Sequence, residues 1–282
     1  MLFRSEEEQP ATNAIAVKWF EAKLRQANQE LNDLFSKYRI SEALMVVYKL
    51  FWDEFSSWYL EMIKPSYGSP IDKKTFEATL QFFETLLKML HPFMPFITEE
   101  LWQHIYTREK GQSIMCEKLT LDAFSTEDCH LIDEIENVKL IVTNIRAVRN
   151  QKNISPKVEL ELHTISQNRY ANYNSVIKKM ANLNNIVEVQ EKAANCALFM
   201  IGTDEFAIPV GDMVDHEAEL AKQEAQLKHL EGFLAGIQKK LSNEKFIANA
   251  PAAVVELEQK KAKDSEEKIA ALKQSIAELK QK

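Results

Sequence analysis

Apolar residues recur at steps of three and four through the first part of the chain, which predicts three amphipathic helices. The first is expected at roughly 14–36 and the third at roughly 73–90. The second is expected to begin after Ser41 as its N-cap and to continue to about residue 62. A stretch rich in Pro and Gly at 64–70 ends it. We expect the apolar stripes of these helices to pack together as a bundle.

Two more helices are predicted after residue 91. Pro95 interrupts the chain, and Thr98 is expected to cap a new helix whose first turn contains Glu99 and Glu100, where carboxylates favour the positive end of the helix dipole. The last helix is expected to begin near residue 125, with apolar residues at helical spacing up to about 145. Residues 1–155 are therefore predicted to form a helical-bundle domain.

After Pro156 the apolar period changes from that of a helix to that of a strand. Alternating apolar and polar residues at 158–163 predict a half-buried strand, and a helix is expected at roughly 172–181. Residues 156–211 are thus predicted to form a small α+β domain with a mixed or antiparallel sheet and the helix on one face. Its other strands are expected at 186–189, 197–201 and 206–210.

From about Met213 apolar residues recur every seven positions, first in a series that includes Leu227 and Leu234 and again in a series that includes Ala262 and Ile269. Two such segments joined by about ten residues predict an antiparallel coiled-coil hairpin at 212–282. Each arm of about 28 residues would project roughly 40 Å at 1.5 Å per residue. The predicted fold is mainly α.

Composition narrows the functional classes. The 282 residues include only six Gly and three widely spaced Cys, which indicates few tight turns, no disulfide framework and a reducing, cytoplasmic location. No secretory signal or membrane span is expected. The formal net charge of −7 argues against nucleic acid when taken alone, but a basic stripe can lie on an acidic protein.

The chain offers little catalytic chemistry. It has no Gly-rich phosphate loop and no nucleotide-binding β-α-β repeat. Cys129 and His130 are adjacent, but no further ligands have metal-site spacing. Glu99 and Glu100 are neighbours on a helix and point in different directions, so they are not read as an acid–base pair. We therefore predict no catalytic and no metal-binding residues.

Several motifs resemble one family. The stretch His91–Trp102 resembles a signature of the anticodon-binding bundle of class I aminoacyl-tRNA synthetases for Val, Leu and Ile, and Phe51–Pro65 and Asn144–Asn150 look like the same family. The segment Lys240–Glu256 is similar to the tip of the C-terminal coiled-coil arm of valyl-tRNA synthetases. The prolines and aromatic residues of His91–Trp102 are interpreted as a structural elbow between two helices.

The resemblance implies a role in ATP-dependent joining of valine to its tRNA. The family's His-Ile-Gly-His and Lys-Met-Ser-Lys-Ser signatures do not occur here, so the chain is expected to be the C-terminal, tRNA-binding piece of such an enzyme, inactive alone. An α/β catalytic and editing region is expected upstream of Met1. The implied cofactors are none in this piece and ATP with Mg for the full-length enzyme. The implied partner is the tRNA for valine, bound by a monomer away from membranes.

Unstacked loop bases are what proteins read in RNA, and exposed aromatic and basic side chains suit that task. Lys37, Tyr38 and Arg39 lie at a predicted inter-helix corner and are the first candidates; the alternative is a solvated turn. Trp52 and Lys64 are weaker candidates. Trp58 lies on the apolar stripe and is read as a core residue instead.

Other candidates lie beyond the bundle's corners. Arg146 and Arg149 either meet phosphates or pair with acids such as Glu136, and both interpretations are open. Family analogy places the hairpin against the corner of the tRNA, where lysines would meet phosphates; the alternative is an ordinary solvated helix surface. These arm lysines are Lys228, Lys239, Lys240 and Lys245.

A rival function is also consistent with the pattern. Heptad repeats are equally typical of a protein–protein adaptor whose coiled coil binds a partner without RNA. A free-standing enzyme would need an active site that the sequence does not reveal.

Overall fold

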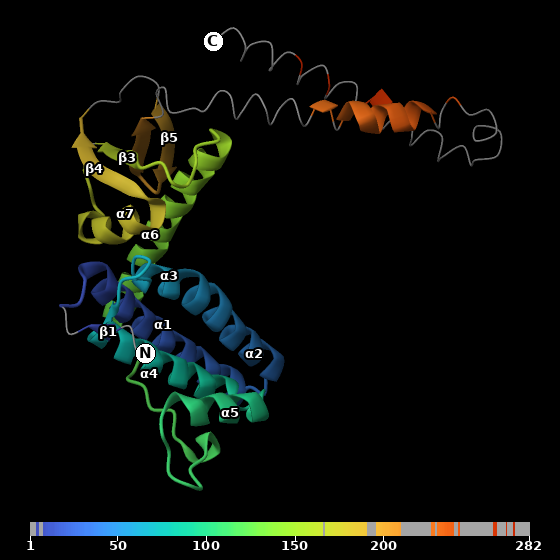
Figure 1. The fold of residues 1–282 in the computed structure, drawn as a ribbon. Coiled ribbons are helices and arrows are strands. Elements are labelled where there is room, and N and C mark those ends of the chain that lie inside the picture. The colour runs from blue at the N-terminus through green and yellow to red at the C-terminus, as the bar shows by residue number, and fades with distance from the viewer. Residues whose placement is uncertain are drawn as a thin grey trace. The chain divides into compact units, whose positions relative to one another are not determined.

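A computed structural model gives the fold of the chain (Figure 1). It describes residues 4–5, 8–165, 167–190, 196–209, 227–228, 230–239, 242, 262–263, 269 and 273. The chain divides into two compact units, 1–146 with 159–209 and 147–158 with 210–282.

The first unit contains the expected helical bundle. Helix α1 (Ala11–Ser36) is followed by α2 (Ile40–Lys49), which runs on through the π-helical η1 (Leu50–Tyr59) into α3 (Leu60–Ile63). The strands β1 (Arg4–Ser5) and β2 (Ile71–Asp72) pair in parallel beside the bundle. The remaining elements here are α4 (Lys73–Leu90), α5 (Pro95–Ile105), the 3-10 turn η2 (Ile114–Cys116) and α6 (Thr126–Gln151), whose last residues belong to the second unit.

Phe20 of α1 lies at the centre of the bundle's core. Its ring lies 5.3 Å from that of Phe55, 5.0 Å from that of Tyr59 and 5.2 Å from that of Phe82, measured between centroids. Three separate helical segments therefore meet on one buried aromatic side chain. Such packing accounts for the apolar positions that recur at helical spacing in this part of the sequence.

Two predicted helix starts are wrong. The second helix begins at Ile40, so Ser41 lies inside its first turn and is not the N-cap. The helix after residue 91 begins at Pro95, and Thr98 lies within it, fully buried. The Thr98 hydroxyl donates to the carbonyl of Met94 and lies 2.8 Å from Nδ1 of His91. Proline suits a first helical position because its fixed φ is already helical and its missing N–H is not needed.

The small sheet matches the predicted β-α-β-β order and is mixed. Strand β3 (Leu160–Ile165) pairs in parallel with β4 (Leu183–Val189) and antiparallel with β6 (Asp204–Pro209), which pairs antiparallel with β5 (Cys196–Ile201). Helix α7 (Asn174–Ala181), entered through the 3-10 turn η3 (Ala171–Tyr173), connects the parallel pair. It contacts α1 and α3 as well as β4, so the sheet and the bundle share one unit.

In the second unit, α6 ends at Gln151 and is followed by a turn in which Asn153 has a φ of 52°. The described arm residues 227–228 and 230–239 are helical. Among them, Leu227, Leu230, Leu234 and Ile237 are the less exposed ones, as the predicted seam requires, and Ile269 is buried as well. Most of the predicted hairpin, including its tip at 240–256, lies outside the described residues. Across the described part of the chain, no helix is long and apolar enough to cross a membrane.

Candidate nucleic-acid interface

The chain turns from α1 into α2 at Tyr38. The N–H of Arg39 donates to the carbonyl of Leu34 (2.9 Å) and the N–H of Tyr38 donates to that of Phe35 (3.0 Å), which is the double hydrogen bond of a Schellman helix end. Tyr38 occupies the left-handed position of this turn, with a φ of 57°. Glycine is favoured there, and a residue with a Cβ is strained by about 1–2 kcal/mol.

The side chain of Tyr38 is 88% exposed. Elsewhere in the described chain, the left-handed non-glycine residues are Asn153 and Asn182, and asparagine tolerates this conformation because its amide bonds locally. A strained, solvated tyrosine has no structural explanation at this corner. It offers a ring face on which a base can stack.

Lys37 and Arg39 precede and follow Tyr38 in the chain. Lys37 Nζ lies 2.7 Å from a carboxylate oxygen of Asp33, and the guanidinium of Arg39 pairs with Glu42. All four side chains are about half exposed. Ion pairs in such positions contribute roughly 0–1 kcal/mol, so a phosphate can replace either carboxylate at little cost. Lys37, Tyr38 and Arg39 are therefore three consecutive exposed residues at the corner between α1 and α2.

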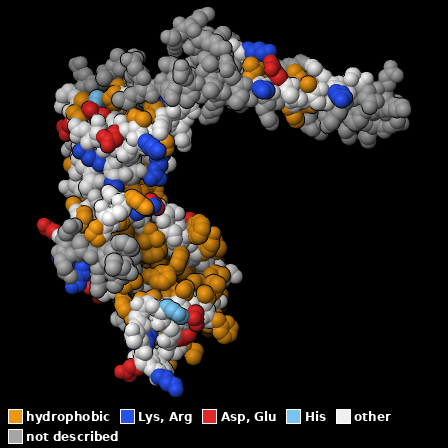
Figure 2. Space-filling view, in the orientation of Figure 1, with side chains coloured by type: hydrophobic (Ala, Val, Ile, Leu, Met, Phe, Trp, Pro, Cys, Tyr) orange, Lys and Arg blue, Asp and Glu red, His pale blue; other side chains and the backbone are white. Residues whose placement is uncertain are grey.

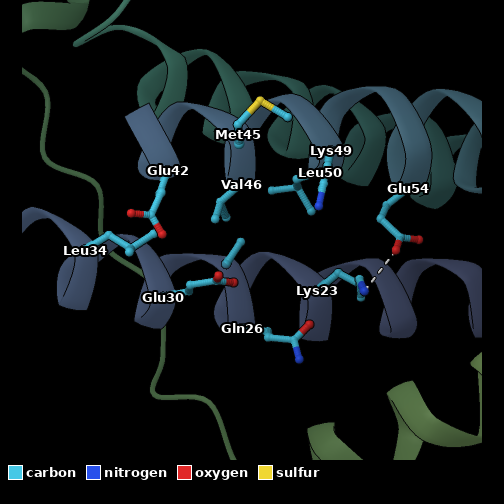
Figure 3. A pocket seen from close by; sticks show the side chains of 11 residues that line it. Lys23, Gln26, Glu30, Leu34, Glu42, Met45, Val46, Lys49, Leu50 and Glu54 are labelled. Atoms are coloured by element: carbon cyan, nitrogen blue, oxygen red, sulfur yellow. Dashed lines mark ion pairs between the residues drawn. The ribbon is translucent and has the colours of Figure 1, made fainter. Parts of the chain in front are cut away.

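An open cleft of ≈ 440 Å³ runs between α1 and α2 (Figure 3). Glu30 and Glu42 line its wall, and Lys23 is held by Glu54 at 3.0 Å. Carboxylates repel phosphate but accept hydrogen bonds from amino groups of bases. The cleft is lined by Lys23 and Lys49 as well, so it offers both acceptors for base amino groups and cations.

Trp52 and Lys64 do not join the corner surface. Trp52 is 60% exposed on η1. Lys64 follows α3, where its Nζ lies 3.2 Å from Glu61. It also lines a second cleft of ≈ 370 Å³ together with Asp72 and Lys179.

The two arginines of α6 are engaged by the protein. The guanidinium of Arg146 donates to the carbonyl of Met180 (3.0 Å) and lies 5.7 Å from the ring centre of Trp58. Arg149 is 5% exposed and donates from one nitrogen to the carbonyls of Ser155 (3.1 Å) and Val158 (2.7 Å). Burial lowers the pKa of Arg149. The carboxylate of Glu136 lies against Lys139 and Lys23.

In the arm, Lys228 and Lys239 are exposed on the described helix. Lys240 and Lys245 lie outside the described residues. The carboxylate of Glu231 lies 2.8 Å from the ammonium of Lys273, so a residue of the outgoing segment meets one of the returning segment. Trp58, predicted to be core, is half-buried against the charged groups of Lys139 and Arg146.

Metal ligands were also sought among the residues that the structure describes. No group of three or more His, Cys, Asp or Glu side chains there is arranged to hold an ion. What the described surface offers is an aromatic ring, flanking cations and carboxylate acceptors at one corner, and lysines on a separate helical segment.

Two sequence families match the chain. Residues 17–164 match the family described as the anticodon-binding domain of tRNA ligase, which covers more than half of the chain. Residues 215–280 match the family described as the valyl tRNA synthetase tRNA binding arm. The two matched segments fall on the bundle with the first strand of the sheet, and on the predicted hairpin.

Similar curated proteins carry one name. A valine–tRNA ligase of Bacteroides thetaiotaomicron is 57% identical over 94% of this chain, and one of Phocaeicola vulgatus is 56% identical over 96%. A more distant valine–tRNA ligase, from Brucella suis, is 32% identical over 92% of the chain. The chain spans only 30%, 31% and 29% of the lengths of these relatives, respectively.

Proposed function

Because this chain belongs to the anticodon-binding family of tRNA ligases, we propose that it is the tRNA-recognition region of a valine–tRNA ligase, with the bundle reading the anticodon stem-loop. The match over residues 17–164 carries this proposal. The match to a tRNA-binding arm over 215–280 supports the valine-specific form and disfavours a protein–protein adaptor without RNA binding.

The corner of Lys37, Tyr38 and Arg39 is the proposed contact with anticodon bases. A stacked base gains roughly 1–3 kcal/mol, which is enough to compensate for a strained backbone at Tyr38. The two cations then exchange their carboxylate partners for phosphates of the loop. The carboxylates of the adjoining cleft, Glu30 and Glu42, accept hydrogen bonds from base amino groups.

The second proposed contact is the arm at 212–282, folded as an antiparallel coiled coil against the outer corner of the tRNA. The pairing of Glu231 with Lys273 and the less exposed seam residues support this hairpin. Its lysines, Lys228, Lys239, Lys240 and Lys245, would meet phosphates as point charges. Arg146 and Arg149 are assigned a structural role, because backbone carbonyls already occupy their guanidinium groups.

Valine activation is proposed to lie in the remainder of the longer protein, which would use ATP with Mg. The 282-residue chain would bind the tRNA for valine as a monomer in the cytoplasm and would not aminoacylate it alone. The domain limits proposed for this role are 1–155, 156–211 and 212–282.

The test is a binding titration of the chain with valine tRNA at several salt concentrations. We expect the affinity to fall with rising salt, with a slope of roughly 0.7–0.9 per phosphate contacted. The matched ligand is the same tRNA with its anticodon bases exchanged, which preserves charge and length. Equal affinity for both tRNAs would exclude anticodon reading.

Light scattering addresses the adaptor alternative. A monomer that binds tRNA agrees with the proposal. An obligate dimer with no affinity for any tRNA would favour the adaptor and refute RNA recognition.

A further inference from the structure

The second cleft, of ≈ 370 Å³, is separate from the corner at Tyr38. The first turn of α1, the segment that follows α3, strand β2 and Lys179 of α7 all line it. These segments are far apart in the sequence but belong to the same compact unit. The fold therefore brings polar groups from four segments to one place, and the chemistry of those groups indicates what the cleft can bind.

The start of α1 supplies hydrogen-bond donors to this cleft. Pro10 is the N-cap residue, and no side chain caps this end of the helix. The first backbone hydrogen bond of α1 runs from the N–H of Ala14 to the carbonyl of Pro10 (3.0 Å). The preceding N–H groups of a helix have no internal partner, and the helix dipole places partial positive charge on them. This end of a 26-residue helix is therefore suited to an anionic acceptor.

The side chain of Thr12 is a second, independent indication of a ligand. Thr12 lines the cleft and is only 8% exposed, yet its hydroxyl has no hydrogen-bond partner among the described residues. Its neighbour Asn13 differs, because its side-chain amide donates to a carboxylate oxygen of Asp72 (2.9 Å). Buried hydroxyl groups are normally paired. The Thr12 hydroxyl thus remains available as a donor to a molecule in the cleft.

Lys179 brings a cation to the same cleft. Its ammonium donates to the carbonyl of Met62 (2.7 Å), which is its one hydrogen bond within the described part of the chain. An ammonium carries three N–H donors, so two remain for another acceptor. Burial lowers the pKa of Lys179, and the nearby charge of Glu61 opposes this effect. A bound anion would compensate for the solvation that the ammonium loses. Figure 2 shows Lys and Arg side chains over α7, whereas the bundle face in view is mostly hydrophobic.

Lys64 is the second cation that lines the cleft. Its Nζ lies 3.2 Å from a carboxylate oxygen of Glu61, and both side chains are exposed. An exposed pair of this kind is weak and exchanges its partner readily. Lys64 can therefore turn from Glu61 to an anion in the cleft.

Two carboxylates also line the cleft, but neither prevents an anion from binding. The oxygens of Asp72 accept hydrogen bonds from the side chain of Asn13 (2.9 Å) and from the N–H of Thr75 (2.8 Å) at the start of α4. The charge of Asp72 is thus already compensated by donors. Glu8 is exposed, so solvent and salt screen its charge. The uncompensated groups of the cleft are cations and donors.

We propose that this cleft is a phosphate-binding site. Lys179 and Lys64 supply the positive charge, and the hydroxyl of Thr12 and the first N–H groups of α1 supply directed donors. The phosphate group can belong to the backbone of a bound RNA or to a free phosphate ion, since the recognition chemistry is the same. The site lies at the opposite end of α1 from Tyr38, roughly 40 Å away at 1.5 Å per residue. As an RNA contact it gives a second point of attachment, and only that version rests on the proposed function.

The experiment titrates the 282-residue chain, labelled with ¹³C in its lysine side chains, with inorganic phosphate. NMR signals of Lys179 and Lys64 should shift and saturate, and the pKa of Lys179 should rise in the presence of phosphate. Lys110, an exposed lysine after α5, is the internal control and should not follow the same curve. Chloride at equal ionic strength should produce no saturable shift. Equal responses of Lys110 and Lys179 to phosphate would overturn the proposal.

Three variants test the assigned roles. Thr12→Val removes the hydroxyl while keeping the shape, and should weaken phosphate binding roughly threefold or more. Lys179→Met should weaken it at least roughly tenfold, whereas Glu8→Gln should strengthen it. Thr85→Val on α4 is the matched control and should have no effect. Thermal unfolding checks that each variant folds, and Thr12→Val still decides the question if Lys179→Met does not fold.

A competition with valine tRNA identifies the source of the phosphate. If the RNA backbone occupies the site, the tRNA should displace inorganic phosphate, and Lys179→Met should reduce the salt slope of tRNA binding by roughly 0.7–0.9. Simultaneous binding of both ligands would assign the site to free phosphate. The absence of a saturable shift at Lys179, together with an unchanged salt slope in Lys179→Met, would overturn the proposal. Failure of the wild-type chain to bind any tRNA would instead count against the proposed function and leave the phosphate titration decisive.

Discussion

The guanidinium of Arg25 donates two hydrogen bonds to the carboxylate of Asp128, one of 2.9 Å from Nε and one of 2.6 Å from a terminal nitrogen. These residues are 103 positions apart, so the pair ties α1 to the first turn of α6. The carboxylate also accepts from the N–H of Ser125, as a helix cap does. The hydrogen bond from Arg25 holds the pKa of Asp128 down to about 2.

Replacement of Arg25 should expose the pH dependence of this pair. Arg25→Ala is expected to lower the free energy of unfolding by about 3 kcal/mol at neutral pH, because it leaves a largely buried carboxylate without its counter-charge. The folded pKa of Asp128 is lower than its ordinary value of 3.8. The stabilisation is therefore complete above that value and is lost as pH falls toward 2.

Urea unfolding of the wild type and of Arg25→Ala, from neutral to acid pH, measures how the difference in free energy of unfolding depends on pH. The difference between wild type and Arg25→Ala should be constant down to roughly pH 5 and should shrink below roughly pH 3. Lys37→Ala, which breaks an exposed pair, is the control and should cost under about 1 kcal/mol. A difference that persists undiminished at the acid end would contradict the assignment to Asp128.

A second prediction concerns Lys139, a lysine only 7% exposed between the rings of Trp19 and Trp58. Its ammonium donates to Glu54 (2.6 Å) and Glu136 (2.8 Å). Burial alone would raise the pKa of Glu54, but the hydrogen bond and charge of Lys139, together with Lys23, leave that pKa lowered. Lys139→Met should therefore destabilise the bundle by about 3 kcal/mol.

The double-mutant cycle with Glu54→Gln tests the cause. If the loss comes from an uncompensated Glu54 charge, the double variant should be more stable than the sum of the single effects by roughly 2 kcal/mol. Chemical denaturation of the four proteins gives the coupling. Purely additive losses would show that packing against the tryptophans, and not charge, explains the effect.

Glycine at position 38 should separate stability from binding. Tyr38→Gly relieves the left-handed strain while adding entropy to the unfolded chain, so stability should be unchanged or raised by up to about 1 kcal/mol. Affinity for valine tRNA should fall by about 1–3 kcal/mol through loss of stacking. Thermal unfolding and a binding titration report the two effects.

Tyr67→Gly is the matched control, since Tyr67 is also a fully solvated tyrosine, in the turn after α3. It should leave tRNA affinity unchanged. Unaltered binding by Tyr38→Gly would remove the base-stacking role from the corner.

Arg149 is predicted to contribute to the stability of the fold and not to RNA binding. Arg149→Ala should lower the free energy of unfolding by about 2 kcal/mol, because the carbonyls of Ser155 and Val158 lose charged donors in a buried place. Under conditions where the variant is fully folded, its tRNA affinity and salt dependence should equal those of the wild type. A shallower salt dependence would reveal a phosphate contact.

The arm lysines should behave in the opposite way. Lys228→Gln and Lys239→Gln change exposed side chains, so stability should move by less than about 0.5 kcal/mol. Each replacement should weaken tRNA binding and reduce the salt slope by roughly 0.7–0.9. Lys110→Gln, an exposed lysine after α5, is the charge-matched control. Equal slopes for all three variants would argue against phosphate contact by the arm.

Local patterns in the sequence were sufficient to predict most elements. The helices α1 and α4 lie close to their predicted limits, and the period-two stretch near residue 160 became β3. Helix starts were less predictable. The pattern alone favoured Thr98 as a polar cap, but the helix begins at Pro95 and the Thr98 hydroxyl is buried inside it. Whether a threonine caps a helix or is buried in it depends on the elements that pack beside it.

Candidate residues were harder to place than elements. The sequence pointed to Lys37, Tyr38 and Arg39 because they stand between two apolar stripes. It did not reveal the positive φ of Tyr38, which depends on how the chain turns from α1 into α2. Arg149 resembled a phosphate ligand because a sequence does not show that carbonyls 6 and 9 residues away receive its donors.

By itself the sequence determined the helical bundle, the small β-α-β-β unit and the family, because hydrophobic periodicity and short motifs are properties of neighbouring residues. Only the tertiary structure decided that Arg25 meets Asp128 and that Lys139 is buried between tryptophans. The reason is physical: periodicity shows which side of a helix avoids water, whereas the partner that excludes the water comes from distant parts of the chain.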